Sequence, residues 1–102
     1  MKANELFKRI EAKTAPVIID PRSEIEFKKG HLPGAINAPV RKLLFNSAVI
    51  PADKETEIVI GCMHGQRAMI GKWLLGCHGY RNIVYLDGWI QEWIKDGLPM
   101  EK

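Results

Sequence analysis

The chain has 102 residues, 46% of them hydrophobic, and a formal net charge of +3 from fifteen basic and twelve acidic residues. This length predicts one domain, residues 1–102, around one core. The charges are scattered, which argues against a nucleic-acid partner, and no apolar run reaches the ~18 residues of a membrane-spanning helix. Two cysteines are too few for a disulfide scaffold, and the charged start favours the cytoplasm over export.

The first half of the chain predicts short alternating helices and strands. Apolar residues recur at helical spacing over residues 3–13, which predicts an amphipathic helix. Residues 17–19 are continuously apolar and β-branched, as in a strand covered on both faces. Ser23 and Glu26 have the spacing of a capping box, which predicts a short helix through about residue 28. Three further elements follow: a turn over 30–34, a strand over 35–37 and a helix over 40–47.

The second half repeats the alternation. A buried strand is expected over 58–60, a strand over 82–86, and a last helix from Trp89 to a stop at Gly97. The helix expected over 68–78 has five residues on one face, which we expect to be buried: Met69, Ile70, Trp73, Leu74 and Cys77. Such alternation predicts a mostly parallel sheet with helices on both faces. With every apolar stripe assigned to the core, we expect a monomer.

The strongest functional signal is the loop of residues 62–67, whose sequence is Cys-Met-His-Gly-Gln-Arg. It follows a buried strand and precedes a helix, so Cys62 should meet several main-chain N–H groups and the positive end of the helix dipole. These groups favour a thiolate. Ligands of parallel sheets bind beyond the carboxyl ends of the strands, where this cysteine is placed. The sequence therefore predicts Cys62 as a nucleophile.

Three further motifs accompany the loop: Asp20-Pro21-Arg22, the run over residues 26–37, and Leu86-Asp87-Gly88 with Trp93. With them the chain resembles the single-domain rhodanese family over about residues 15–99. The resemblance implies a five-stranded, mostly parallel α/β sheet and sulfur transfer through a cysteine persulfide. It implies a small-molecule sulfur donor and a thiol acceptor. The acceptor thiol can belong to a small molecule or to a protein. Nothing in the sequence demands a metal or an organic cofactor.

The resemblance also carries roles to individual residues. It makes Cys62 the nucleophile and Arg67 the arginine that closes the loop, and it makes Met63, His64, Gly65 and Gln66 the rest of the substrate-binding loop. Five positions match residues that support the family's scaffold: Asp20, Arg22, His31, Pro33 and Gly34. For the first three, a structural ion pair or hydrogen bond is favoured over a catalytic role.

Three residues depart from the family's pattern. Pro21 stands where an apolar residue is usual, which affects packing. Met63 occupies a place often held by a basic residue, and Trp89 replaces the second glycine of a frequent pair. Met63 has no charge with which to attract a dianion such as thiosulfate. A less charged persulfide is therefore an open alternative as the sulfur donor. Trp89 is expected either to line the pocket rim or to pack. His64 is expected to donate to a bound anion, to move a proton or simply to be solvated.

The second cysteine, Cys77, is expected to pack in the core. A helix of ~10 residues separates it from Cys62 by about 15 Å, whereas a disulfide needs Cα atoms within ~7 Å. The same distance weakens a zinc site built from the local cysteines and histidines: Cys62, His64, Cys77 and His78.

Two other functions compete with sulfur transfer. Cysteine-dependent phosphatases and arsenate reductases also use a thiolate in an N–H-lined loop, but their loops resemble Cys-x5-Arg, one residue longer than the loop here. The longer loop makes a wider cradle for a tetrahedral oxyanion. An inactive rhodanese-like module that only binds partners would generally lack the cysteine, which this chain retains.

Overall fold

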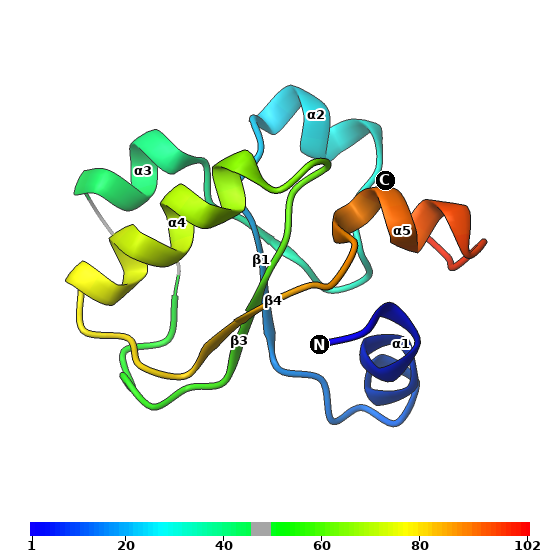
Figure 1. Cartoon of the computed structure of the whole chain (residues 1–102), viewed down its shortest axis with the longest axis horizontal. Helices are drawn as coiled ribbons and strands as arrows, with labels where there is room; N and C mark the ends of the chain where they lie inside the picture. The colour runs from blue at the N-terminus through cyan, green and yellow to red at the C-terminus, as the bar shows by residue number, and fades with distance from the viewer. Residues whose placement is uncertain (46–49) are drawn as a thin grey trace.

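The computed structural model describes residues 1–45 and 50–102. Helices and strands alternate along the chain (Figure 1). In order, they are α1 (Ala3–Glu11), β1 (Val17–Asp20), α2 (Glu24–Lys29), β2 (Ile36–Asn37), α3 (Val40–Phe45), β3 (Ile58–Ile60), α4 (Gln66–Cys77), β4 (Ile83–Tyr85) and α5 (Trp89–Lys95). Each element predicted from the sequence is present, although residues 46–47 of the third predicted helix lie outside the described part of the chain.

The strands form a parallel sheet in the order β2-β1-β3-β4. The predicted α/β fold is confirmed, but the sheet of the described residues has four strands rather than five. The sequence contains four strand-like runs, and the one further bridge in this part of the chain is a single antiparallel pair between His31 and Glu101. One pair is too short to add a strand to the sheet.

Each face of the sheet is covered by a different pair of helices. Successive side chains of a strand point to opposite faces, so neighbouring residues pack against different helices. Ile19 packs in the core cluster that includes residues of α3 and α4, whereas Ile18 packs with residues of α1 and α5. Figure 1 shows these two helix pairs on opposite sides of the strands. This double cover explains why the strands are continuously apolar.

The orientation of α4 contradicts the sequence-based prediction. Three of its predicted core residues are largely exposed: Met69 at 53%, Ile70 at 49% and Trp73 at 68%. Cys77 is exposed as well, so its predicted core role is wrong. The residues that face the core are Ala68, Gly71, Leu74 and Leu75. A small residue is required at position 71 because α4 lies close to the sheet there: a Cβ at Gly71 would stand 2.7 Å from Cδ1 of Ile60.

This orientation leaves an apolar stripe on the outside of the protein. The expectation of a monomer rested on the absence of such a stripe, and that premise is wrong. The oligomeric state itself stays a prediction. Across residues 1–45 and 50–102, no helix has the length and hydrophobicity needed to cross a membrane.

A buried ion pair joins the carboxyl end of β1 to the segments beside it. Asp20 and Arg22 are 2% and 3% exposed. The Asp20 carboxylate accepts hydrogen bonds from Nε, at 3.0 Å, and Nη2, at 2.9 Å, of Arg22. Arg22 Nη2 also donates to the carbonyl of Gly30 at 2.6 Å, and the Asn37 amide donates to the carbonyl of Arg22 at 2.8 Å. The pair therefore ties β1 to the end of α2 and to β2.

We predict that Asp20→Asn lowers the free energy of unfolding by on the order of 3 kcal/mol, because it leaves the Arg22 cation buried without its anion. Urea unfolding at neutral pH measures this loss. The control is Glu24→Gln, which breaks an ion pair with Lys42 whose side chains are both 50% exposed. Exposed pairs stabilise little, so a loss of equal size in the two variants would contradict the structural role of the buried pair.

Candidate functional site

The candidate site is the loop between β3 and α4. β3 is a central strand of the sheet, paired with β1 on one side and β4 on the other. Cys62 follows it after one glycine and is 2% exposed. The main-chain N–H of Ile90 donates to the Cys62 carbonyl at 3.0 Å, which ties the start of α5 to the loop. The cysteine is thus held at the carboxyl end of the sheet by two elements.

Two main-chain N–H groups point at the Cys62 sulfur. Gly65 donates to Sγ at 3.0 Å, and Ala68, in the first turn of α4, donates at 3.4 Å. Donors aimed at a sulfur atom stabilise negative charge on it, and the start of a helix adds its dipole. The loop therefore provides an electrostatic environment in which a sulfur anion is stabilised.

Gly65 makes this geometry available because it adopts φ +97°, a left-handed conformation that side chains rarely adopt. The indole of Trp89 lies directly against it, and a Cβ at position 65 would meet Cε2 of Trp89 at 2.4 Å. Trp89 itself has φ +61°, which is uncommon for a bulky residue. Its ring packs edge-on against Tyr85, with centroids 5.3 Å apart. Trp89 therefore both packs in the core and covers the turn of the loop.

Arg67 forms a two-pronged ion pair with Glu26 of α2. Its Nη1 lies 2.5 Å from Oε1 and its Nη2 lies 2.9 Å from Oε2. The hydrogen bonds from Arg67 lower the pKa of Glu26 to about 2, against the opposing effect of burial, and bonds from Ser23 act in the same direction. The pKa of Arg67 is raised, chiefly by its hydrogen bond to Glu26 and also by the charge of that carboxylate, against the opposing effect of burial. The guanidinium is therefore already engaged by a carboxylate.

Glu26 was missed as a site residue. Its spacing from Ser23 predicted a helix cap, and the reciprocal cap is present, with the Ser23 hydroxyl 2.9 Å from Oε1 of Glu26. The capping role alone accounts for the local sequence pattern at this residue. No local signal connects it to Arg67, because 41 positions separate the two in the chain.

The other loop side chains point in different directions. His64 is exposed, and its Nδ1 lies 3.0 Å from the amide oxygen of Gln91 on α5. Gln66 is exposed. Met63 is half-buried against the cluster of α1 and α5, and it lines a shallow groove together with Glu26 and Arg22. Of residues 62–67, Gly65 is the one whose N–H reaches the Cys62 sulfur in this structure.

His31 serves the end of α2. Its Nδ1 lies 2.8 Å from the carbonyl of Phe27, and its ring stacks on the Phe27 ring with centroids 3.7 Å apart. Together with Asp20 and Arg22, it belongs to the packed segments beneath the loop rather than to the surroundings of the sulfur.

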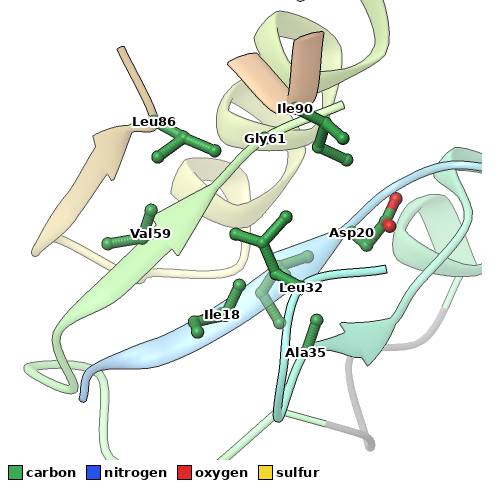
Figure 2. Close-up of a pocket in the computed structure, with 9 residues that line it drawn as sticks. Ile18, Asp20, Leu32, Ala35, Val59, Gly61, Leu86 and Ile90 are labelled. Carbon is green, nitrogen blue, oxygen red and sulfur yellow. The ribbon is translucent and has the colours of Figure 1, made fainter. Parts of the chain in front are cut away.

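A cavity also lies between the sheet and α5, but it is too small to bind a substrate. Figure 2 shows Ile18, Val59, Leu86 and Ile90 around it, with Asp20 at its edge. Its volume is about 10 Å³, near the lower limit for one water molecule. Substrate must therefore approach the loop from outside the protein.

The described part of the chain contains no cluster of three metal-ligating side chains. Cys62 and Cys77 are both free thiols, and Cys77 lies in the last turn of α4 while Cys62 precedes its first. The reactive side chain of the loop is thus one free cysteine, to which two main-chain N–H groups donate.

Comparisons with known proteins agree with this geometry. A relative from Arabidopsis thaliana, rhodanese-like domain-containing protein 14, chloroplastic, is 29% identical, and the match covers 91% of this chain and 61% of that protein. The thiosulfate:glutathione sulfurtransferase of Saccharomyces cerevisiae is 30% identical, with 91% and 76% covered. The structure of the human single-domain sulfurtransferase TSTD1 superposes with a TM-score of 0.77 at 27% identity, covering 93% and 94%.

The chain thus spans about three fifths of the Arabidopsis relative and most of the other two. The family model described as the rhodanese-like domain matches residues 2–96, which include both β3 and the loop that follows it. Family match, sheet topology and cysteine loop all agree, so this chain belongs to the rhodanese-like domain family.

Proposed function

We propose that this protein is a sulfurtransferase that carries sulfur as a persulfide on Cys62 and passes it to a thiol. The observation that carries the proposal is the pair of N–H groups, from Gly65 and Ala68, directed at the Cys62 sulfur. Both relatives that are named sulfurtransferases, from yeast and human, support the reaction class. We also propose that the protein is cytoplasmic, that it is monomeric in its free state and that it works without a cofactor.

The reaction has two steps. In the first, the Cys62 thiolate attacks the outer sulfur of the donor; a Cys62 S–S bond forms and the donor's bond to that sulfur breaks. From thiosulfate the leaving group is sulfite, and from a persulfide it is a thiolate. In the second, an acceptor thiolate attacks the outer sulfur of the Cys62 persulfide, which releases the Cys62 thiolate and forms a new persulfide. No net oxidation occurs, because one S–S bond replaces another in each step.

The pairing of Arg67 with Glu26 bears on the choice of donor. A dianion such as thiosulfate gains most from an unpaired arginine, whereas both outer nitrogens of this guanidinium already face a carboxylate. Met63 adds no charge at the position next to the cysteine. We therefore propose that a less charged persulfide is a better donor than thiosulfate.

The same pairing argues against a phosphatase. That chemistry needs an arginine that holds a phosphoryl dianion, and a neighbouring carboxylate repels such a group. Loop length points in the same direction, because four residues rather than five separate Cys62 from Arg67. A module that only binds partners would have no need to direct two N–H groups at a buried sulfur.

We predict that Cys62→Ser abolishes sulfur transfer and that Cys77→Ser leaves it intact, because the second thiol is exposed at the far end of α4. Mass spectrometry after treatment with a persulfide or thiosulfate should show an addition of about 32 Da, one sulfur, in the wild type and in Cys77→Ser alone. Initial rates with cyanide as acceptor should give parallel double-reciprocal lines. Turnover that persists in Cys62→Ser would refute the mechanism.

We predict that Glu26→Gln lowers the KM for thiosulfate several-fold, on the order of 1 kcal/mol of binding, because it releases Arg67 toward the dianion. Steady-state kinetics with thiosulfate and cyanide measure the effect. Glu24→Gln, on the same helix but paired with Lys42, is the matched control and should leave the KM unchanged. An unchanged KM in Glu26→Gln would show that Arg67 does not govern donor binding.

The Glu26 pKa also predicts a dependence of stability on pH. Folding lowers this pKa from its ordinary value near 4.5 to about 2, so the carboxylate stabilises the folded state above pH 4.5. That contribution decreases as the pH falls from 4.5 toward 2. The difference in unfolding free energy between wild type and Glu26→Gln should therefore be larger at pH 7 than at pH 3. A difference that stays constant with pH would contradict the lowered pKa.

A further inference from the structure

The outward face of α4 forms, together with β4, a surface groove that the proposed chemistry does not use. Six residues line it: Met69, Lys72, Trp73, Gly76, Cys77 and Tyr85. Trp73 is 68% exposed and Met69 is 53% exposed, although both are large and apolar. Contiguous apolar surface of this kind is a mark of binding sites. We call this surface the α4 groove.

Aromatic contacts connect the α4 groove to the cysteine loop. The Trp89 indole lies against Gly65, whose N–H donates to the Cys62 sulfur. The Tyr85 ring packs against Trp89, and the Lys72 ammonium lies 4.7 Å from the centre of the Tyr85 ring. Trp73 follows Arg67 by six residues, or ~9 Å of helix. A partner seated at the Met69 end of the groove therefore lies beside the loop that holds Cys62.

The one charged residue among those that line the groove is basic, Lys72. Residues 58–86 contain three basic residues, Arg67, Lys72 and Arg81, and no aspartate or glutamate. Arg67 is paired with Glu26, and Arg81 lies 3.5 Å from Glu55. Among the ion pairs of the described residues, none includes Lys72. The groove thus offers one unpaired cation next to exposed apolar side chains.

This charge pattern opposes a second copy of the chain as the occupant. A symmetric dimer through the groove would bring Lys72 of one copy near Lys72 of the other, with no acidic residue on α4 to separate them. An acidic hollow with Asp87, Glu92 and Asp96 lies elsewhere on the protein. Pairing that hollow with the groove would join copies head to tail, and such an arrangement need not close into a ring of defined size.

We propose that the α4 groove is the docking site for an acidic, partly apolar segment of a protein whose thiol exchanges sulfur with Cys62. An apolar side chain of the segment contacts Trp73 and Met69, and a carboxylate beside it pairs with Lys72. The sulfur exchange rests on the proposed function, but the docking itself does not. Transfer is balanced as before: the partner thiolate takes the outer sulfur, and Cys62 is left as a thiolate.

The test uses three short fluorescent peptides of equal length, each with one cysteine. The first is rich in aspartate and contains one leucine, the second has lysine in place of aspartate, and the third has serine in place of leucine. Fluorescence anisotropy with the unmodified protein measures binding without any sulfur chemistry. We expect the first peptide to bind about tenfold more tightly than either of the others, and added salt to weaken it.

Two surface variants locate the binding. Lys72→Glu and Trp73→Ser should each weaken the first peptide about tenfold. The matched controls are Lys95→Glu on α5 and Ile25→Ser on α2, an isoleucine that is 70% exposed; both should bind as the wild type does. Equal affinity for the acidic and the basic peptide, or equal effects of the groove variants and the controls, would overturn the proposal.

Sulfur transfer separates this proposal from the proposed function. With the Cys62 persulfide formed, Lys72→Glu and Trp73→Ser should lower kcat/KM for the acidic peptide about tenfold and leave that for cyanide within about twofold. A wild type that binds the peptide but forms no persulfide would refute the sulfurtransferase and leave the docking site standing. A dimer in sedimentation analysis that Trp73→Ser abolishes would instead assign the groove to a second copy.

Discussion

The geometry of the candidate site depends above all on the shorter of the two hydrogen bonds to the Cys62 sulfur, from the main-chain N–H of Gly65 at 3.0 Å. A main-chain donor reaches that position because residue 65 turns through a left-handed conformation that only glycine adopts easily. Residues of α5 that lie against this turn hold it in place. Trp89 covers it from α5, and the Ile90 N–H holds the Cys62 carbonyl. The sulfur environment is therefore built by two segments that are far apart in the sequence, the loop after β3 and the start of α5.

Electrostatics then divide the loop into two parts. Around the sulfur the donors are neutral N–H groups, which stabilise a charge without adding one. The formal charge, on Arg67, is compensated by Glu26 in the first turn of α2. That ion pair fastens the start of α4 to α2, but it also reduces the positive field available to a dianionic substrate. The contact that fastens the loop is thus also the one from which we infer a less charged donor.

The sequence predicted what is local and missed what is long-range. The Ser23 and Glu26 cap, the strands and the position of Cys62 follow from spacings of a few residues, and all are found. The link between Glu26 and Arg67 spans 41 positions, so no spacing indicates it. The buried face of α4 was misjudged because apolar residues occur on nearly all its sides. Only the close approach of α4 to Ile60 requires the small Gly71 on the inside and so turns Trp73 outward.

That rotation of α4 has a functional consequence. A helix that only covered a sheet would place its largest apolar residues inward and charged residues outward. Here the inner face is narrow because the backbone packs closely, and that close packing positions the Ala68 N–H at the Cys62 sulfur. Met69, Ile70 and Trp73 are left on the surface near Lys72, while Leu74 and Leu75 fill the inner face. The helix start that stabilises the sulfur and the exposed groove are therefore two results of one packing constraint, which explains why a partner bound to α4 would also be close to the sulfur it receives.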